Sequence, residues 1–207
     1  MSRIGIFGGT FNPVHVAHLL VAEAVCEERA LDTVLFVPAG WPPHKTDEPL
    51  APAADRARMV ELAVGDAPRF AVERLELARE GPSYTLLTVR ELRDRRGAGN
   101  EMFLLLGGDS LLDLPNWWRA DELVAEVRII AFARPGWALR EAWDGLAARF
   151  GRDWVDGVRE SLVQVPLVDV SATDIRQRLR SGRSVRYMVP EAVRRYIVER
   201  GLYAPGR

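Results

Sequence analysis

The sequence predicts an α/β protein with a Rossmann-like, doubly wound parallel sheet and a small C-terminal helical part. Short apolar runs that suit buried strands alternate along the chain with longer runs of helical pattern. Strands that alternate with helices imply right-handed βαβ crossovers, and therefore a parallel sheet. From Ser171 onward only helical patterns follow. We expect a single domain over residues 1–207, in which residues 171–207 form a helical subregion.

The apolar runs define the expected strands. The first run is stopped by Gly8 and Gly9, and the second is ended by Pro38. The run that leads to Gly107 is the most apolar of the chain. Strands are expected over 3–7, 33–38, 70–76, 101–109, 127–136 and 162–170.

Helices are expected between these strands and at the C-terminal end. The last helix is opened by Pro190 and closed by Gly201. The order of the strands cannot be inferred from the pattern, but a doubly wound sheet binds its ligand beyond the carboxyl ends of its strands. The loops that follow the strands are therefore where a site is expected. The expected helices cover 18–31, 53–66, 83–97, 119–126, 138–157, 171–182 and 190–201.

Composition excludes several classes of protein. The formal net charge is −1, which gives no global attraction to nucleic acid or to a membrane, and no apolar run reaches membrane-spanning length. We expect no nucleic-acid and no membrane partner. No signal peptide is visible, and a single cysteine, Cys26, suits a reducing compartment, so a cytoplasmic protein is expected. Cys26 lies in an apolar helical run and is expected to be buried. A homo-oligomer is left open.

The loop "GGTFNPVHVAH" follows the first expected strand directly. Glycines there let the backbone approach a ligand closely. Asn12 can cap the next helix and Pro13 suits its first position, which places His15 and His18 in the first turns on one face. A helix start carries free N–H groups and the positive end of the dipole, so two imidazoles there predict an anion site, with phosphate as the obvious anion.

Other interpretations of this loop remain open. A His-x-x-His pair can bind zinc, although the helical zinc signature spaces its histidines at i, i+4 with a glutamate between them. Both histidines could also be ordinary surface or capping residues. Lys45, the only lysine of the chain, lies in "WPPHK". It is either a solvated surface charge or a mobile ammonium that the loop requires.

Six stretches together carry a family resemblance. "GGTFNPVHVAH" resembles the signature of the nucleotidyltransferases that contain an H-x-G-H element, with Ala17 at the glycine position. "VPAGWPPHK", "GPSYTLLTVREL", "GGDSLLDLPNWWRADEL", "ARPG" and "VSATDIRQRL" resemble, in the same order, the bacterial nicotinate-nucleotide adenylyltransferase family. The six motifs extend from Gly8 to nearly the end of the chain. Ala17 departs from the pattern by one methyl group that must fit beside the loop.

The resemblance implies a reaction and a site. The family joins nicotinate mononucleotide to the AMP part of ATP and releases pyrophosphate, so ATP and nicotinate mononucleotide are the expected partners. Mg2+ is expected with ATP, held chiefly by phosphates and water, and no metal-binding side chains are expected. The implied catalytic residues are His15, His18 and Lys45. The implied ATP-binding residues are Gly9, Thr10, Phe11, Gly107, Asp109, Ser171 and Arg176. The implied mononucleotide-binding residues are Tyr84, Thr85, Trp117 and Arg134.

Several of these motifs also have simpler explanations. Ser171 and Asp174 fit a capping box, which by itself marks only a helix start, while the resemblance implies that Ser171 and Arg176 hold the β- and γ-phosphates of ATP. Asp109, which the family would use for the ribose, could instead cap the helix that follows.

The nicotinate side of the implied site depends on a helix start and a pair of tryptophans. Ser83 is expected to cap the helix, so that the N–H groups of Tyr84 and Thr85 face a carboxylate. The resemblance implies that the ring of Trp117 stacks on the pyridine. Core packing is the simpler expectation for its neighbour Trp118.

Rival functions also follow from the sequence. The same chemistry could act on nicotinamide mononucleotide or phosphopantetheine, although "GPSYT" together with "LPNWW" favours nicotinate. A nucleotide-binding regulator without turnover is a second rival. The arginines between Arg176 and Arg200 suggest a nucleic-acid binder, but Glu191 and Glu199 lie among them and no aromatic stacking pattern is present. That stretch is interpreted as a solvated helix face.

Overall fold

A computed structural model describes residues 1–43, 50–97, 99–133, 140–166 and 168–204 of the chain. These residues form two compact units, each made from three separate stretches. Unit 1 consists of Met1–Phe7, Val21–Val34 and Tyr84–Leu167. Unit 2 consists of Gly8–Leu20, Leu35–Ser83 and Val168–Arg207. The expectation of a single domain stays a prediction.

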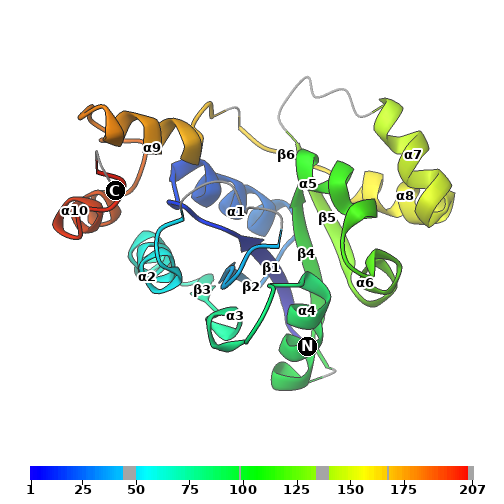
Figure 1. Cartoon of the computed structure of the whole chain (residues 1–207). Coiled ribbons are helices and arrows are strands. Elements are labelled where there is room, and N and C mark those ends of the chain that lie inside the picture. Colours follow the sequence, from blue (N-terminus) through cyan, green and yellow to red (C-terminus); the bar gives the residue numbers. More distant parts are fainter. Residues whose placement is uncertain (44–49, 98, 134–139, 167, 205–207) are drawn as a thin grey trace. The chain divides into compact units, whose positions relative to one another are not determined.

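Six strands form one sheet in the order β3-β2-β1-β4-β5-β6 (Figure 1). The pairs β1–β4, β4–β5 and β5–β6 are parallel, with Ile6 opposite Leu104 and Leu105 opposite Ile130. This order reverses between β1 and β4, as in the doubly wound Rossmann sheet, so the predicted fold class is confirmed. The strands are β1 (Arg3–Gly9), β2 (Thr33–Pro38), β3 (Phe70–Val72), β4 (Glu101–Gly107), β5 (Arg128–Ala133) and β6 (Val163–Gln164).

The helices of the described residues follow the expected alternation with the strands. α5 was not expected: it begins directly after β4 and places Leu111 in the core. The helices are α1 (Val16–Glu28), α2 (Ala53–Val64), α3 (Leu75–Ala78), α4 (Thr85–Arg96), α5 (Gly108–Asp113), η1 (Leu114–Asn116), α6 (Ala120–Glu126), α7 (Arg140–Phe150), α8 (Arg152–Glu160), α9 (Ala172–Arg180) and α10 (Glu191–Glu199).

Three expected elements are shorter or divided. The strand expected over 70–76 ends at Val72, and the chain continues into α3. The strand expected over 162–170 is only β6, Val163–Gln164. The helix expected over 138–157 breaks at Gly151, whose φ of 92° suits glycine and ends a helix.

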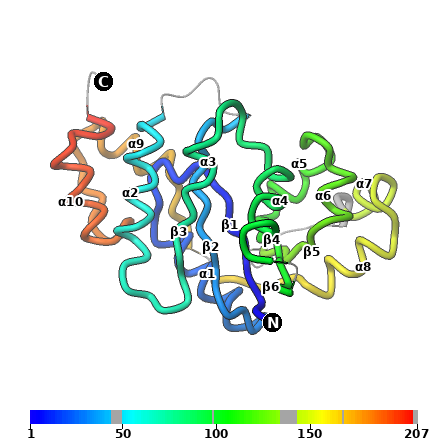
Figure 2. The backbone as a smooth tube through the Cα atoms, turned by 90° about the horizontal axis from the view of Figure 1, so that it is seen from below, coloured from blue at the N-terminus to red at the C-terminus, as the bar shows by residue number. Residues whose placement is uncertain are grey.

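Each unit has its own apolar core. In unit 1 the central part of β4, Met102–Leu106, is buried, as the apolar run predicted. The buried position of Cys26 in α1 is also confirmed, and its thiol donates to the carbonyl of Leu31 at 3.2 Å. In unit 2, α10 lies beside α2 (Figure 2), and the hydroxyl of Tyr196 donates to Asp55 at 2.7 Å.

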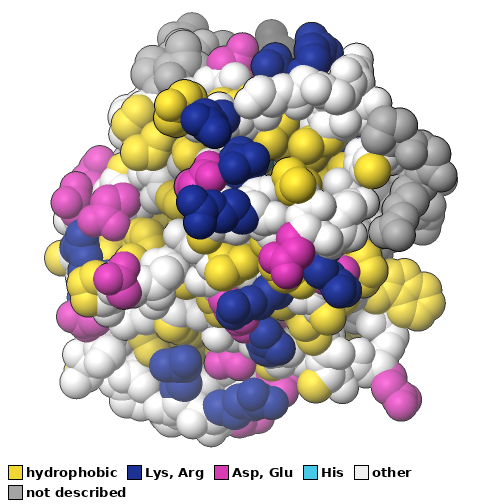
Figure 3. All heavy atoms as spheres, turned by 90° about the vertical axis from the view of Figure 1, so that its left-hand side faces the viewer, with side chains coloured by type: hydrophobic (Ala, Val, Ile, Leu, Met, Phe, Trp, Pro, Cys, Tyr) yellow, Lys and Arg dark blue, Asp and Glu magenta, His cyan; other side chains and the backbone are white. Residues whose placement is uncertain are grey.

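Three arginines of the arginine-rich stretch have acidic partners within unit 2. Arg194 and Arg195 both pair with Glu191 on α10, and Arg200 pairs with Asp55. On the face of the molecule that carries α10, basic and acidic side chains are interspersed (Figure 3). These pairs support a solvated helix face rather than a continuous basic surface. In the described part of the chain, every helix is too short or too polar to cross a membrane.

Candidate active site

The histidine loop, residues 8–18, begins at the end of β1 in unit 2. The carbonyl of Gly9 accepts a hydrogen bond from the N–H of Ala39 at 2.9 Å, which ties the loop to the end of β2. A Cβ at Gly9 would lie 3.0 Å from the ring of Phe11, so a side chain there would press on that ring. Phe11 is buried at a φ of 46°, and its ring packs edge-on against His18.

His15 and His18 lie face to face. Their ring centroids are 3.7 Å apart, and His15 is 7% exposed. The backbone N–H of His15 donates to Nδ1 of His18 at 3.2 Å. An Nδ1 that accepts carries no proton, so the proton of the neutral His18 ring is on Nε2, where it can be donated to an anion.

The start of α1 differs from the expected one. The helix begins at Val16, so the expected cap at Asn12 and first helical position at Pro13 are wrong. His15 precedes the helix and His18 lies in its first turn. The N–H of Val16 is donated to the carbonyl of Met188 at 3.0 Å, so this helix start offers fewer amides to a ligand than the pattern suggested.

Asn12 connects distant parts of unit 2. Its Oδ1 accepts from the N–H of Ala51 at 3.1 Å and from the hydroxyl of Tyr203 at 2.7 Å. Its backbone carbonyl accepts from Nη1 of Arg176 at 2.9 Å. Burial raises the pKa of Tyr203, which keeps the phenol protonated and able to donate. Asn12 is a buried anchor of the loop because its side-chain and backbone oxygens accept from these long-range partners.

Arg56 of α2 fixes the backbone around the histidine loop. It is 1% exposed, and its guanidinium donates to the carbonyls of Ala51 at 3.0 Å, Thr10 at 2.7 Å and Gly40 at 3.1 Å. Burial lowers the pKa of Arg56, and nearby Glu76 partly offsets this effect. Three carbonyls from three loop segments are thus held by one planar donor group.

The start of α9 carries the other predicted phosphate ligands of unit 2. Ser171 is the N-cap, and its Oγ accepts from the N–H of Asp174 at 3.0 Å, which confirms the helix start. Arg176 is 4% exposed and contacts Thr173 Oγ1 at 3.2 Å in addition to Asn12. The structure thus joins Arg176 to the histidine loop. Its role toward phosphate stays a prediction.

In unit 1, Gly107 is the last residue of the most apolar strand, β4, and Asp109 follows it. A Cβ at Gly107 would lie 3.1 Å from the ring of Phe132, so a side chain there would displace that ring. Asp109 is exposed in the first turn of α5, and the cap position is occupied by Gly107 rather than by Asp109. The carboxylate of Asp109 is therefore not used as a helix cap.

The start of α4 is the predicted carboxylate site. Tyr84 occupies the cap position and Thr85 is the first helical residue. The expected cap at Ser83 is wrong, because its Oγ accepts from the N–H of Trp41 at 3.1 Å. Among the described residues, no protein group accepts from the N–H groups of Tyr84 and Thr85, which are the donors expected to face a carboxylate.

The two tryptophans that follow η1 have different surroundings. The indole N–H of Trp117 donates to Asp113 Oδ2 at 3.2 Å, which fixes its half-buried ring. Trp118 is 39% exposed, so the expectation that it packs in the core is wrong. Its ring stacks on Tyr84, with centroids 4.6 Å apart and an interplanar angle of 21°.

The predicted residues thus fall into two groups, one in each unit. Lys45 and Arg134 lie outside the described residues. Within the described ranges, no cluster of three or more His, Cys, Asp or Glu side chains could hold a metal ion. The group in unit 2 is Gly9, Thr10, Phe11, His15, His18, Ser171 and Arg176, and the group in unit 1 is Tyr84, Thr85, Gly107, Asp109 and Trp117.

Three residues that shape the histidine loop were missed or misinterpreted. Asn12 was expected to cap a helix, and Tyr203 was not considered. Arg56 was expected only as one charged residue of the helix over 53–66. It is buried, whereas Arg58, two positions further on, is exposed. No local pattern distinguishes the two arginines, because the carbonyls that Arg56 binds come from other segments.

Comparisons with known proteins agree with the motifs. Residues 6–178 match the family model described as cytidylyltransferase-like. The chain is 46% identical over 201 residues to a probable nicotinate-nucleotide adenylyltransferase of Thermus thermophilus. The matched region covers 97% of this chain and 99% of the relative. The chain is also 44% identical over 204 residues to a protein of the same description from Thermomicrobium roseum. That match covers 98% of this chain and 92% of the relative.

A solved structure supports the fold. The nicotinic acid mononucleotide adenylyltransferase of Plasmodium falciparum, complexed with NaAD, matches with a TM-score of 0.73 at 18% identity, and 98% of each chain is covered. At that identity the similarity concerns the fold alone. The family model spans most of the chain, and the bacterial relatives are similar over nearly their whole length. The chain therefore belongs to the cytidylyltransferase-like family and, within it, to the nicotinate-nucleotide adenylyltransferases.

Proposed function

We propose that this enzyme transfers the adenylyl group of ATP to nicotinate mononucleotide, giving deamido-NAD and pyrophosphate. The observation that carries the proposal is the similarity, over 97% of the chain, to a relative described as performing this chemistry. The helix start at Tyr84 and Thr85 supports an acidic acceptor, because amide N–H groups and the helix dipole favour a carboxylate over a neutral carboxamide.

The reaction needs no protein nucleophile. An oxygen of the mononucleotide's phosphate attacks the α-phosphorus of ATP, and the bond between that phosphorus and the bridging oxygen to the β-phosphate breaks. The new dinucleotide bridge forms as pyrophosphate takes the bonding electrons. The enzyme contributes position and charge neutralisation, which together account for most of the catalysis in phosphoryl-group chemistry.

The histidine loop is the proposed phosphate side of the site. His18 donates its Nε2–H to the phosphates as charge builds on the leaving pyrophosphate, and His15 holds that ring in place through its own N–H. The amides of Gly9, Thr10 and Phe11 line the phosphate path, with Lys45 as a further cation. Ser171 and Arg176 contribute at the β- and γ-phosphates, and Gly107 and Asp109 bind the adenosine.

The start of α4 and the loop before α6 are the proposed nicotinate side. The N–H groups of Tyr84 and Thr85 bind the carboxylate, and the ring of Trp117, fixed by Asp113, stacks on the pyridine. Arg134 contacts the mononucleotide. Mg2+ arrives with ATP and is held chiefly by phosphates and water. The cytoplasmic location and the oligomeric state stay predictions.

The experiment is a pyrophosphate-release assay with ATP and one acceptor at a time, with the product identified by mass. Turnover of nicotinate mononucleotide to deamido-NAD is expected. Turnover only with nicotinamide mononucleotide or only with phosphopantetheine would show that this compound, and not nicotinate mononucleotide, is the acceptor. Binding of ATP without turnover of any acceptor would identify a nucleotide-binding regulator instead.

A further inference from the structure

The loop that carries Trp117 continues into three stacked planar groups. Trp118 stacks on the ring of Tyr84, with centroids 4.6 Å apart, and the guanidinium of Arg119 lies over the Trp118 ring, 5.1 Å from its centroid. Aromatic stacking and the cation–π contact hold an indole that is 39% exposed. An indole fixed in this way at the surface does not serve the hydrophobic core. It joins the loop before α6 to the first residues of α4.

Arg119 adopts a backbone conformation that is uncommon for it. Its φ is 54° and its ψ is 44°, in the left-handed region, and it occupies the cap position of α6. Residues other than glycine, asparagine and aspartate visit this region rarely, because Cβ crowds the backbone. Here a long charged residue occupies a position where glycine would fit without strain, which indicates that the guanidinium is needed.

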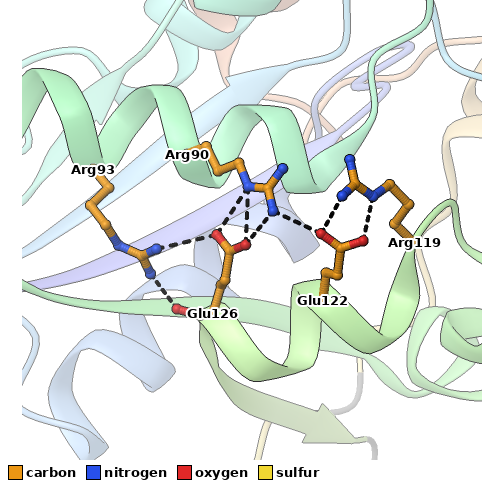
Figure 4. Close-up of polar contacts among 5 residues, drawn as sticks. All are labelled: Arg90, Arg93, Arg119, Glu122 and Glu126. Carbon is orange, nitrogen blue, oxygen red and sulfur yellow. Dashed lines mark hydrogen bonds and ion pairs between the residues drawn. The ribbon is translucent and has the colours of Figure 1, made fainter.

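A chain of ion pairs fixes that guanidinium (Figure 4). Two nitrogens of Arg119, Nε and Nη2, donate to the two carboxylate oxygens of Glu122. Glu122 also accepts from Arg90 of α4 at 2.9 Å. Arg90 in turn binds both carboxylate oxygens of Glu126.

Figure 4 shows the arginines and glutamates aligned along the two facing helices, α4 and α6. Glu126 also accepts from Arg93. Hydrogen bonds from Arg119 lower the pKa of Glu122, and those from Arg90 lower the pKa of Glu126. Both carboxylates are therefore ionised at neutral pH, and the chain of pairs is complete.

We propose that Arg119 is a positioning residue for the nicotinate pocket, held by Glu122 and Arg90 so that the Tyr84–Trp118 stack sets the spacing between Trp117 and the start of α4. This inference rests on the proposed function, because it assigns the pyridine and its carboxylate to these two elements. Trp117 and the start of α4 both belong to unit 1. The ion pairs of Arg90 connect α4 to α6, the helix that follows the tryptophan loop. Arg119 does not touch the mononucleotide. It acts through Trp118.

The test uses three variants and a matched control. Arg119→Gly removes the guanidinium and also removes the backbone strain, so its thermal midpoint should stay within about 3 °C of the wild type. Glu122→Gln keeps the shape of the side chain and weakens both arginine pairs. Arg119→Ala removes the guanidinium but keeps the strain. Arg95→Ala is the control, since Arg95 is an exposed arginine of α4 that forms an ion pair with Glu91 of the same helix.

Steady-state kinetics with ATP and nicotinate mononucleotide should separate positioning from general stability. In Arg119→Gly and Glu122→Gln, KM for the mononucleotide should rise about tenfold while KM for ATP stays within about twofold. Arg119→Ala should raise the same KM and lower the thermal midpoint. Arg95→Ala should match the wild type.

Three results would overturn the inference. These are an unchanged mononucleotide KM in both Arg119→Gly and Glu122→Gln, an equal rise in both KM values, or a stability loss in Arg119→Gly as large as that in Arg119→Ala. Failure of the wild-type enzyme to turn over nicotinate mononucleotide would contradict the proposed function itself. That outcome differs from one in which the wild-type enzyme is active and the variants have the same KM values as the wild type, which would contradict only the role of Arg119.

Discussion

The hydroxyl of Tyr203 donates a 2.7 Å hydrogen bond to Oδ1 of Asn12, so a residue near the C-terminal end supports the loop that carries both histidines. Arg176 holds the backbone carbonyl of the same asparagine. The two contacts fix Asn12 from its side chain and from its backbone. Together with the bonds from Arg56 to Thr10 and from Ala39 to Gly9, these contacts hold the loop after β1 in place.

Tyr203→Phe tests this support. The variant removes one hydroxyl and leaves Asn12 with one fewer donor, so the free energy of unfolding should fall by about 1 kcal/mol. Tyr187→Phe is the matched control, because Tyr187 is 85% exposed and should show no change. Urea denaturation measures both. Equal stability of the two variants would show that the Tyr203 hydrogen bond contributes nothing.

Arg56→Met should destabilise the protein far more. The substitution leaves the carbonyls of Ala51, Thr10 and Gly40 without the donor that now binds them, at a cost of about 3 kcal/mol. Arg58→Met, two residues further along α2, should change stability by less than about 0.5 kcal/mol, because Arg58 is exposed. Chemical denaturation of the pair decides the point. A small effect at Arg56 would mean that water can satisfy those carbonyls.

His18→Ala should lower kcat by about 10²-fold or more, because the donor proposed to stabilise the leaving pyrophosphate is lost. The ring also packs against Phe11 and His15, so the folded state of the variant is checked by circular dichroism. Single-turnover rates with saturating substrates measure the chemical step. A folded variant with a near-normal rate would remove His18 from the mechanism.

Trp117→Ala should chiefly raise KM for the mononucleotide, since the stacking surface for the pyridine is lost. Trp117→Phe keeps an aromatic ring and should recover most of the affinity, although it lacks the indole N–H that Asp113 now accepts. Initial rates at varied concentrations of each substrate separate the two KM values. A rise confined to KM for ATP would reverse the assignment of this pocket.

The sheet and most helices could be predicted because their patterns are local. The strand at Thr33–Pro38 and the helix start at Ser171 each depend on neighbouring residues, and both were confirmed. Asn12 and Ser83 were both wrongly expected to cap helices. Their oxygens instead accept hydrogen bonds from residues distant in the chain, Tyr203 and Trp41. Such partners are decided by tertiary packing, which no short window of sequence contains.

The two tryptophans show the same limit within the candidate site. "PNWW" indicates an aromatic loop, but it does not say which ring is covered and by what. Trp118 is held by Tyr84, more than thirty positions earlier in the chain, and by Arg119 in a left-handed conformation that the pattern does not indicate. The chemistry of the loop could be predicted from its residues, whereas the parts that position it could not.

The central claim is that an amide-lined helix start selects an acidic pyridine nucleotide as acceptor. The most direct measurement is kcat/KM of the wild-type enzyme for nicotinate mononucleotide and for nicotinamide mononucleotide, each at saturating ATP. We predict a preference of about 10²-fold or more for the acid, because the N–H groups of Tyr84 and Thr85 meet a charged oxygen only in that substrate. Equal values for the two acceptors would contradict it.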